Sequence, residues 1–158
     1  MIEQYNLSFL NLKSIENVLF QTQTNTHGLL TNGISSFNVG MPILLHQQLK
    51  GLYLILQQYV RMYCNQYDLG NFKFINSWFN ITEPKSKLKK HNHGNNGLSG
   101  ALYVSVGRKS VPLIFTETKI QPYPGLLIIF PSHLDHYTTE EKERRIVMSF
   151  NTEFYEVL

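Results

Sequence analysis

Three histidines offer the side chains and the spacing that a metal site requires. His91 and His93 flank Asn92, and in an extended segment residues two apart point to the same side. Both imidazoles can therefore reach one ion. A third imidazole comes from His136, which follows the turn-rich residues 131–135. Since neutral imidazole is a common ligand of iron, zinc, copper and nickel, the pattern predicts a three-histidine metal centre.

A cation, Arg145, follows the third histidine by nine positions. A turn between them would bring the strand of Arg145 back beside His136, deeper in the domain than the metal. A buried guanidinium needs a planar anion, and a carboxylate is the obvious match. The alternative is a structural ion pair with Glu141 or Glu143. The adjacent Arg144 suits that surface role better, because neighbouring strand residues face opposite sides.

The elements that position these residues are predicted to be mainly strands. Five segments are rich in β-branched and aromatic residues and are separated by polar, Gly or Pro breaks: residues 72–81, 98–106, 111–118, 125–131 and 144–150. Before them, apolar side chains recur at steps of three and four from Leu45 to Tyr63, which predicts an amphipathic helix that stops near Gly70. Ser14 is expected to cap a shorter helix. A helix followed by many short strands indicates a β-sandwich or a jelly roll.

The chain of 158 residues is expected to form a single domain, 1–158, with 1–70 as mainly helical N-terminal support and 71–158 as the core that holds the metal site. Its 42% hydrophobic and 16% charged residues are typical of a globular protein. The net charge of +3 comes from dispersed basic residues, so we expect no nucleic-acid partner. The lysine-rich residues 85–90 are predicted to be a solvated loop.

Cys64 is the single cysteine and cannot form an internal disulfide. The N-terminus lacks the layout of a signal peptide, and no apolar run is long enough to span a bilayer. We therefore expect no membrane partner and a cytoplasmic location, which is the host cytoplasm if the protein is viral. The small size and the frequent asparagines favour a viral or phage origin.

The order and spacing of the three histidines and Arg145 resemble the Fe(II)/2-oxoglutarate oxygenases, which carry a His-x-Asp pair, a distant His and an Arg or Lys shortly beyond it. The flanking sequences are similar to one branch of that family. They are NSWFN (76–80), SGALY (99–103), GLLIIFPS (125–132) and RIVMSFN (145–151). The resemblance covers roughly residues 28–152.

This resemblance implies a mostly β (α+β) double-stranded β-helix, a cupin-like jelly roll, with one or two supporting N-terminal helices. It implies Fe(II) bound by the three histidines, and 2-oxoglutarate as cosubstrate with its distal carboxylate held by Arg145 and Tyr103. The implied enzyme is a dioxygenase that uses molecular oxygen, converts 2-oxoglutarate to succinate and hydroxylates a small-molecule or peptide substrate. Further candidates for substrate contact or support of the site are Trp78, Asn80, Asn95 and Asn151.

The departure from the family pattern is His93, which stands where most members have a carboxylate. An imidazole there adds one positive charge to the metal complex, which would strengthen the binding of an anionic cosubstrate. Alternatively Asp135 ligates the metal, or His93 only supports the ligands. Asp135 is the weaker candidate, because as the neighbour of His136 it would face the opposite way in a strand.

Three other readings stay open. The chain could be a three-histidine cupin-like metalloprotein that does not use 2-oxoglutarate, or a non-catalytic viral accessory module that keeps the fold. A structural zinc site would need a fourth ligand, for which His133 is the candidate. His27 and His46, like His133, are otherwise predicted to be ordinary solvated or hydrogen-bonded side chains. A homodimer through an edge strand or through residues 45–65 is a further option.

Overall fold

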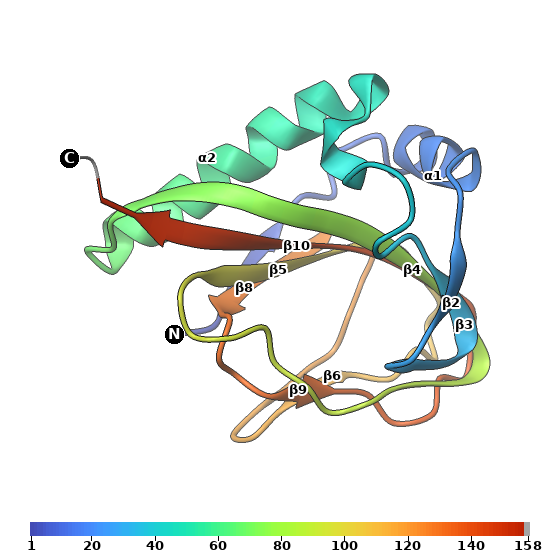
Figure 1. Cartoon of the computed structure of the whole chain (residues 1–158). Helices are drawn as coiled ribbons and strands as arrows, with labels where there is room; N and C mark the ends of the chain where they lie inside the picture. The colour runs from blue at the N-terminus through green and yellow to red at the C-terminus, as the bar shows by residue number, and fades with distance from the viewer. Residues whose placement is uncertain (157–158) are drawn as a thin grey trace.

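The computed structural model describes residues 1–156 and consists of two antiparallel sheets and two α-helices (Figure 1). The elements in chain order are β1 (Glu3–Asn6), α1 (Leu12–Phe20), β2 (Asn25–His27), β3 (Leu30–Ser35), the 3-10 turns η1 (Ile43–Leu45) and η2 (Gln47–Leu49), α2 (Lys50–Gln66), β4 (Asn71–Leu88), β5 (Leu98–Val106), β6 (Leu113–Phe115), β7 (Lys119–Ile120), β8 (Leu126–Pro131), β9 (His136–Tyr137) and β10 (Arg145–Tyr155).

The large sheet has seven strands in the order β1-β8-β5-β10-β4-β3-β2, and the small sheet has the order β7-β6-β9. Every pairing is antiparallel. The two sheets face each other, and α1 and α2 cover the outer face of the large one (Figure 1). The predicted mostly β jelly roll with two supporting helices is confirmed. The N-terminal 70 residues also contribute β1, β2 and β3 to the large sheet.

Strand β10 shows how the sheet separates a packed layer from a cavity. Ile146 and Met148 are buried in the apolar cluster that includes the helix residues. The alternate residues Arg145 and Val147 line the cavity between the sheets. The alternation follows from the two-residue period of a strand. Burial of the apolar layer supplies the main stabilisation of the domain, and it fixes which strand residues can face the cavity.

Helix α2 begins later than the apolar pattern predicted. Leu45 lies in η1 and is 64% exposed, so the prediction that it belongs to the buried face of the helix was wrong. From Leu52 onward the pattern holds, and Leu56 and Val60 are fully buried. The helix ends at Gln66, and the reversal uses Asp68 in the left-handed region (φ 51°) rather than Gly70. No helix among the described residues has the length and apolar character needed to cross a bilayer.

Three further boundaries differ from those predicted. Asn11 caps α1, because its side chain accepts a hydrogen bond from the Ser14 N–H at 3.1 Å, so Ser14 lies inside the helix. Within the predicted strand 111–118, only Leu113–Phe115 is extended and paired as β6. Residues 85–88 belong to strand β4 rather than to a loop. Their lysines are exposed all the same.

Candidate metal and cosubstrate site

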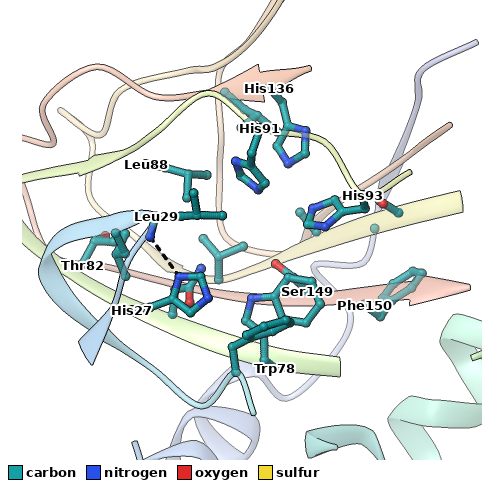
Figure 2. A pocket seen from close by; sticks show the side chains of 18 of the residues that line it. His27, Leu29, Trp78, Thr82, Leu88, His91, His93, His136, Ser149 and Phe150 are labelled. Atoms are coloured by element: carbon teal, nitrogen blue, oxygen red, sulfur yellow. Dashed lines mark hydrogen bonds between the residues drawn. The ribbon is translucent and has the colours of Figure 1, made fainter. Parts of the chain in front are cut away.

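Pairing of two distant segments brings the three histidines together. The backbone of His91 exchanges hydrogen bonds with that of His136, at 3.2 and 2.9 Å. The N–H of His93 donates to the carbonyl of Ser132 at 2.8 Å. One ring nitrogen from each histidine then lies within 4.8 Å of the other two. The group therefore has the composition and the spacing of a metal site (Figure 2).

Local hydrogen bonds orient two of the three rings. The Nδ1 of His91 lies 2.7 Å from the carbonyl oxygen of Lys89, and the Nδ1 of His136 lies 2.9 Å from that of Leu134. A carbonyl can only accept, so each Nδ1 carries the proton and each Nε2 keeps its lone pair. Such a bond fixes the tautomer of a ligand histidine and raises its basicity. The ring of His93 instead packs against another ring of the cavity wall, that of Trp78, at 5.7 Å.

Burial keeps the three imidazoles neutral. Desolvation, together with the neighbouring His136 and His91, lowers the pKa of His93 to about 3. Desolvation also lowers the pKa of His136 to about 4, opposed by the hydrogen bond to Leu134. The pKa of His91 is lowered by the same cause. Since only the neutral imidazole binds a metal, the group is in its binding form at neutral pH.

The histidines lie at one side of a cavity of about 200 Å³ between the sheets. Figure 2 shows the three rings converging above the cavity, with Trp78 and Ser149 on the facing wall. Arg145 and Tyr103 line the same cavity. The structure thus brings the predicted metal ligands and the two predicted cosubstrate residues to one space.

Arg145 is only 4% exposed and makes contacts through one of its three nitrogens. Its Nη1 donates to the carbonyl of Val111 at 3.1 Å and lies 2.8 Å from a carboxylate oxygen of Glu141, which is also buried. The alternative structural pair with Glu141 is therefore formed. The Nε of Arg145 is buried and has no hydrogen-bond partner among the described residues. Because a guanidinium offers five N–H donors, Arg145 keeps donors for an anion.

Tyr103 reaches the cavity from β5, next to a bulge that shifts the register against β10 between Ile146 and Val147. Its ring lies 5.7 Å from the guanidinium carbon of Arg145. Burial raises the pKa of the Tyr103 hydroxyl, although the charge of Arg145 opposes this. The hydroxyl therefore stays protonated and is a potential donor.

The remaining sequence-predicted site residues divide into two groups. Trp78 and Asn80 line the cavity. Asn95 and Asn151 do not, so a role for them in substrate contact or in support of the site stays a prediction. Asn95 is exposed in the loop after His93. Asn151 is buried, and its Oδ1 accepts a hydrogen bond from the Ser99 hydroxyl at 2.7 Å, so it joins β10 to β5.

The alternative ligands lie away from the metal group. Asp135 accepts a hydrogen bond from the Asn92 side chain at 2.8 Å and pairs with Lys90 at 3.5 Å. His133 is exposed. Neither belongs to the group of convergent ligand atoms among residues 1–156. Arg144 pairs with Glu83 at the surface, the role expected for it.

Several cavity residues were missed from the sequence. His27, which the sequence predicts to be a solvated or hydrogen-bonded side chain, lines the cavity, as do Thr82, Asn92 and Ser149. His27 lies more than sixty positions before His91, so no local spacing links the two. The alternation along β4 and β10 could have identified Thr82 and Ser149, because they share a strand face with Trp78 and Arg145 respectively.

Comparison with known proteins gives matches in structure alone. No protein-family model matches the chain, and no curated protein matches it in sequence. A prolyl-4-hydroxylase from Pseudomonas putida superposes with a TM-score of 0.70 at 15% identity, covering 98% of this chain and 93% of that one. The viral collagen prolyl hydroxylase of Paramecium bursaria Chlorella virus-1, in complex with 2-oxoglutarate, gives a TM-score of 0.66 at 16% identity, with coverage of 98% and 96%.

HygX from Streptomyces hygroscopicus, with nickel, 2-oxoglutarate and hygromycin B bound, gives a TM-score of 0.71 at 9% identity, covering 97% of this chain and 82% of that one. A further similar structure, from Burkholderia pseudomallei, is described as an oxidoreductase of the 2OG-Fe(II) oxygenase family. Likeness at such low identity establishes the fold. The chain has the double-stranded β-helix fold of the 2OG-Fe(II) oxygenases, and it places three histidines together in the pattern His-x-His…His.

Proposed function

We propose that this protein is an Fe(II)/2-oxoglutarate-dependent oxygenase that hydroxylates a small-molecule or peptide substrate and converts 2-oxoglutarate to succinate. One observation carries the proposal. The cavity that the three convergent histidines border is also lined by Arg145, a buried cation with an unpaired donor. A metal site alone needs no such cation, whereas a dicarboxylate cosubstrate does.

The histidine group fits a catalytic iron better than a structural metal. It offers three neutral imidazoles, which suit iron, and a fourth protein ligand is lacking in the group formed by residues 1–156. A structural zinc site would be closed by four ligands. When bound, iron would supply the activation of oxygen and the oxidation of the substrate.

The residues of this chain would bind and orient the metal and 2-oxoglutarate and shield them from water. His91, His93 and His136 would hold the metal through ring nitrogens. Arg145 would bind the distal carboxylate of 2-oxoglutarate, and the protonated hydroxyl of Tyr103 would donate a hydrogen bond to the same group. Support comes from HygX and the viral hydroxylase, whose structures contain 2-oxoglutarate.

The test is the visible absorption band of the iron chelate. Fe(II) is added anaerobically to metal-free protein, and 2-oxoglutarate is then titrated. We expect a band that His136→Ala abolishes and that needs far more 2-oxoglutarate in Arg145→Ala. Arg144→Ala is the matched control, because its side chain is exposed and pairs with Glu83 at the surface. It should leave the titration unchanged.

The other outcomes separate the competing functions. Iron binding without a band would favour the three-histidine metalloprotein that does not use 2-oxoglutarate. The ion pair between Glu141 and Arg145 supports that alternative, because Arg145 already has a carboxylate partner within the protein. Absence of iron binding would favour a non-catalytic module that keeps only the fold.

A further inference from the structure

His27 is a cavity residue outside the metal group. It ends strand β2, and the next two residues form the turn into β3. Figure 2 shows its ring across the cavity from the three metal histidines. Its Nδ1 accepts a hydrogen bond from the Leu29 N–H at 3.2 Å. A nitrogen that accepts holds no proton, so the proton of the neutral ring is on Nε2, and His27 is a hydrogen-bond donor there.

Hydrogen bonds connect His27 to the metal group through the backbone of two residues, Leu29 and Lys89. The Leu29 N–H donates to the His27 ring, and the Leu29 carbonyl accepts from the Lys89 N–H at 2.9 Å. The Lys89 carbonyl in turn lies 2.7 Å from the Nδ1 of His91. Each link is a hydrogen bond of normal length, so the turn that carries His27 is joined to the segment that carries His91.

Aromatic packing holds His27 from the other side. Its ring meets Phe37 edge to face at 5.0 Å, and Phe37 meets Trp78 in the same manner at 5.0 Å. Trp78 then contacts His93 at 5.7 Å. These contacts make one continuous wall of rings, with the Nε2–H donor of His27 at one end. Leu29, Leu30 and Leu88 add apolar surface beside it.

The charge of the cavity restricts what this wall can bind. No acidic side chain lines the cavity among residues 1–156, and its one ion-pairing cation is Arg145. Two carboxylates lie near the lining residues. Glu141 pairs with Arg145, and Asp135 is bonded to Asn92 and Lys90. A cationic group in the cavity would therefore lose its hydration without a counter-charge, which is costly.

We propose that His27 is a substrate-binding residue, that its Nε2–H donates to an acceptor oxygen of the substrate such as the carbonyl of an amide, and that the substrate is a neutral molecule whose apolar part packs on the Phe37–Trp78 wall. Cationic substrates are disfavoured. This proposal rests on the proposed function, because it assigns the open side of the cavity to the substrate and the Arg145 side to 2-oxoglutarate.

Three probes of similar shape test the assignment: phenylacetamide, phenylacetate and 2-phenylethylamine. Each is titrated by ligand-observed NMR into protein saturated with Zn(II) and 2-oxoglutarate, so that the metal and the cosubstrate position are filled. We expect phenylacetamide to bind and the amine to bind at least tenfold more weakly. His27→Phe keeps a ring against Phe37 but removes the donor. It should weaken phenylacetamide binding about five- to tenfold, the size of one hydrogen bond.

The matched control is His46→Phe. The Nδ1 of His46 accepts a hydrogen bond from the N–H two residues on, that of Gln48 at 3.3 Å, as in His27, but His46 does not line the cavity. This variant should bind phenylacetamide like the unaltered protein. Equal binding of amide and amine, tighter binding of phenylacetate than of the amide, no binding of the amide, or unchanged binding in His27→Phe would each overturn the proposal.

Failure of the proposed function is distinguishable. The Fe(II)/2-oxoglutarate band is measured in the same variants, and His27→Phe should retain it. If the unaltered protein gives no band, 2-oxoglutarate is not the cosubstrate, and the probes are titrated with Zn(II) alone. A His27-dependent preference for the amide would then still uphold His27 as a ligand-binding residue of the cavity, and its absence would overturn that role.

Discussion

Glu141 and Arg145 form an ion pair of 2.8 Å in which both side chains are almost fully buried. The second carboxylate oxygen of Glu141 accepts from the N–H of Val111 at 3.1 Å and from that of Lys142 at 3.0 Å. Glu141 is therefore fixed by the backbone, and it fixes Nη1 of Arg145. The pair positions the guanidinium but also neutralises part of its charge.

The first prediction concerns Glu141→Gln. Removing one charge leaves Arg145 buried and unpaired, so the metal-free protein should lose about 3–5 kcal/mol of unfolding free energy. Added Fe(II) and 2-oxoglutarate should then stabilise the variant more than they stabilise the unaltered protein, because the cosubstrate carboxylate replaces the missing charge. Urea denaturation with and without the ligands measures both effects.

The control for that experiment is Glu83→Gln, which breaks the exposed pair with Arg144. An exposed pair contributes less than about 1 kcal/mol, so this variant should unfold like the unaltered protein. If the ligands stabilise Glu141→Gln no more than the unaltered protein, Arg145 does not bind the cosubstrate carboxylate.

The second prediction is a pH dependence of stability in the metal-free protein. His93 and His136 have pKa values lowered by burial to about 3 and about 4, against 6.5 in the unfolded chain. Between pH 6.5 and 4 the unfolded state binds more protons than the folded state, so stability falls as the pH falls. The loss is about 1.4 kcal/mol per pH unit for each histidine well below pH 6.5.

Denaturation from pH 7.5 to 4.5 measures this slope. Saturating Zn(II) should raise the stability but keep or steepen the slope, because metal binding holds the imidazoles of the folded state unprotonated. The double variant His93→Gln, His136→Gln should flatten the slope between pH 6.5 and 4.5. An unchanged slope in that variant would mean that other groups cause the acid sensitivity.

The third prediction uses Trp78, the single tryptophan of the chain, as a reporter. Its ring lies 5.7 Å from that of His93. A paramagnetic ion such as Ni(II) bound at the histidine group should therefore quench its fluorescence in a saturable manner. His93→Ala should weaken the titration strongly. Quenching of equal affinity in His93→Ala would show that His93 is not a ligand.

The fourth prediction concerns His93→Asp, which introduces the carboxylate that most of the resembled family carries. Metal binding should persist, because a carboxylate is also an iron ligand. The affinity for 2-oxoglutarate should fall by about tenfold or more, since the charge of the metal complex drops by one unit and charges a few Å apart interact by several kcal/mol in a protein site. The chelate band, titrated in both proteins, measures the change.

The sequence contained enough information for the fold and for the metal group, because both depend on local periodicity and order. Strand β5 occupies residues 98–106 as predicted, whereas the role of Tyr103 was implied by the family resemblance. To predict that His91 and His136 converge, it was enough to expect that the two segments that carry them lie side by side. The ends of elements were less accurate. Leu45 continued an apolar period but lies in a 3-10 turn, and tertiary packing rather than periodicity decided where α2 begins.

The role of His27 could not be predicted, because every contact that places it is tertiary. The backbone bond from Lys89 to Leu29 and the ring contact with Phe37 join segments that no spacing rule connects. The same holds for Glu141. Its position four residues before Arg145 suggested a pair, but not that both side chains would be buried beside the cavity.

The two faces of β10 set the limits on sequence change in this protein. Met148 and its alternate neighbours are buried beneath the helices, where another apolar side chain of similar volume can substitute at little cost. Arg145 and Ser149 face the cavity, where function selects the chemical group. A one-residue slip of β10 against β4 and β5 would exchange the two faces, so it would bring hydrocarbon to the cavity and a guanidinium beneath the helices. Point substitutions can therefore change the helix-facing layer one side chain at a time. A shift in the pairing register of β10 would instead disrupt the fold and the cavity together.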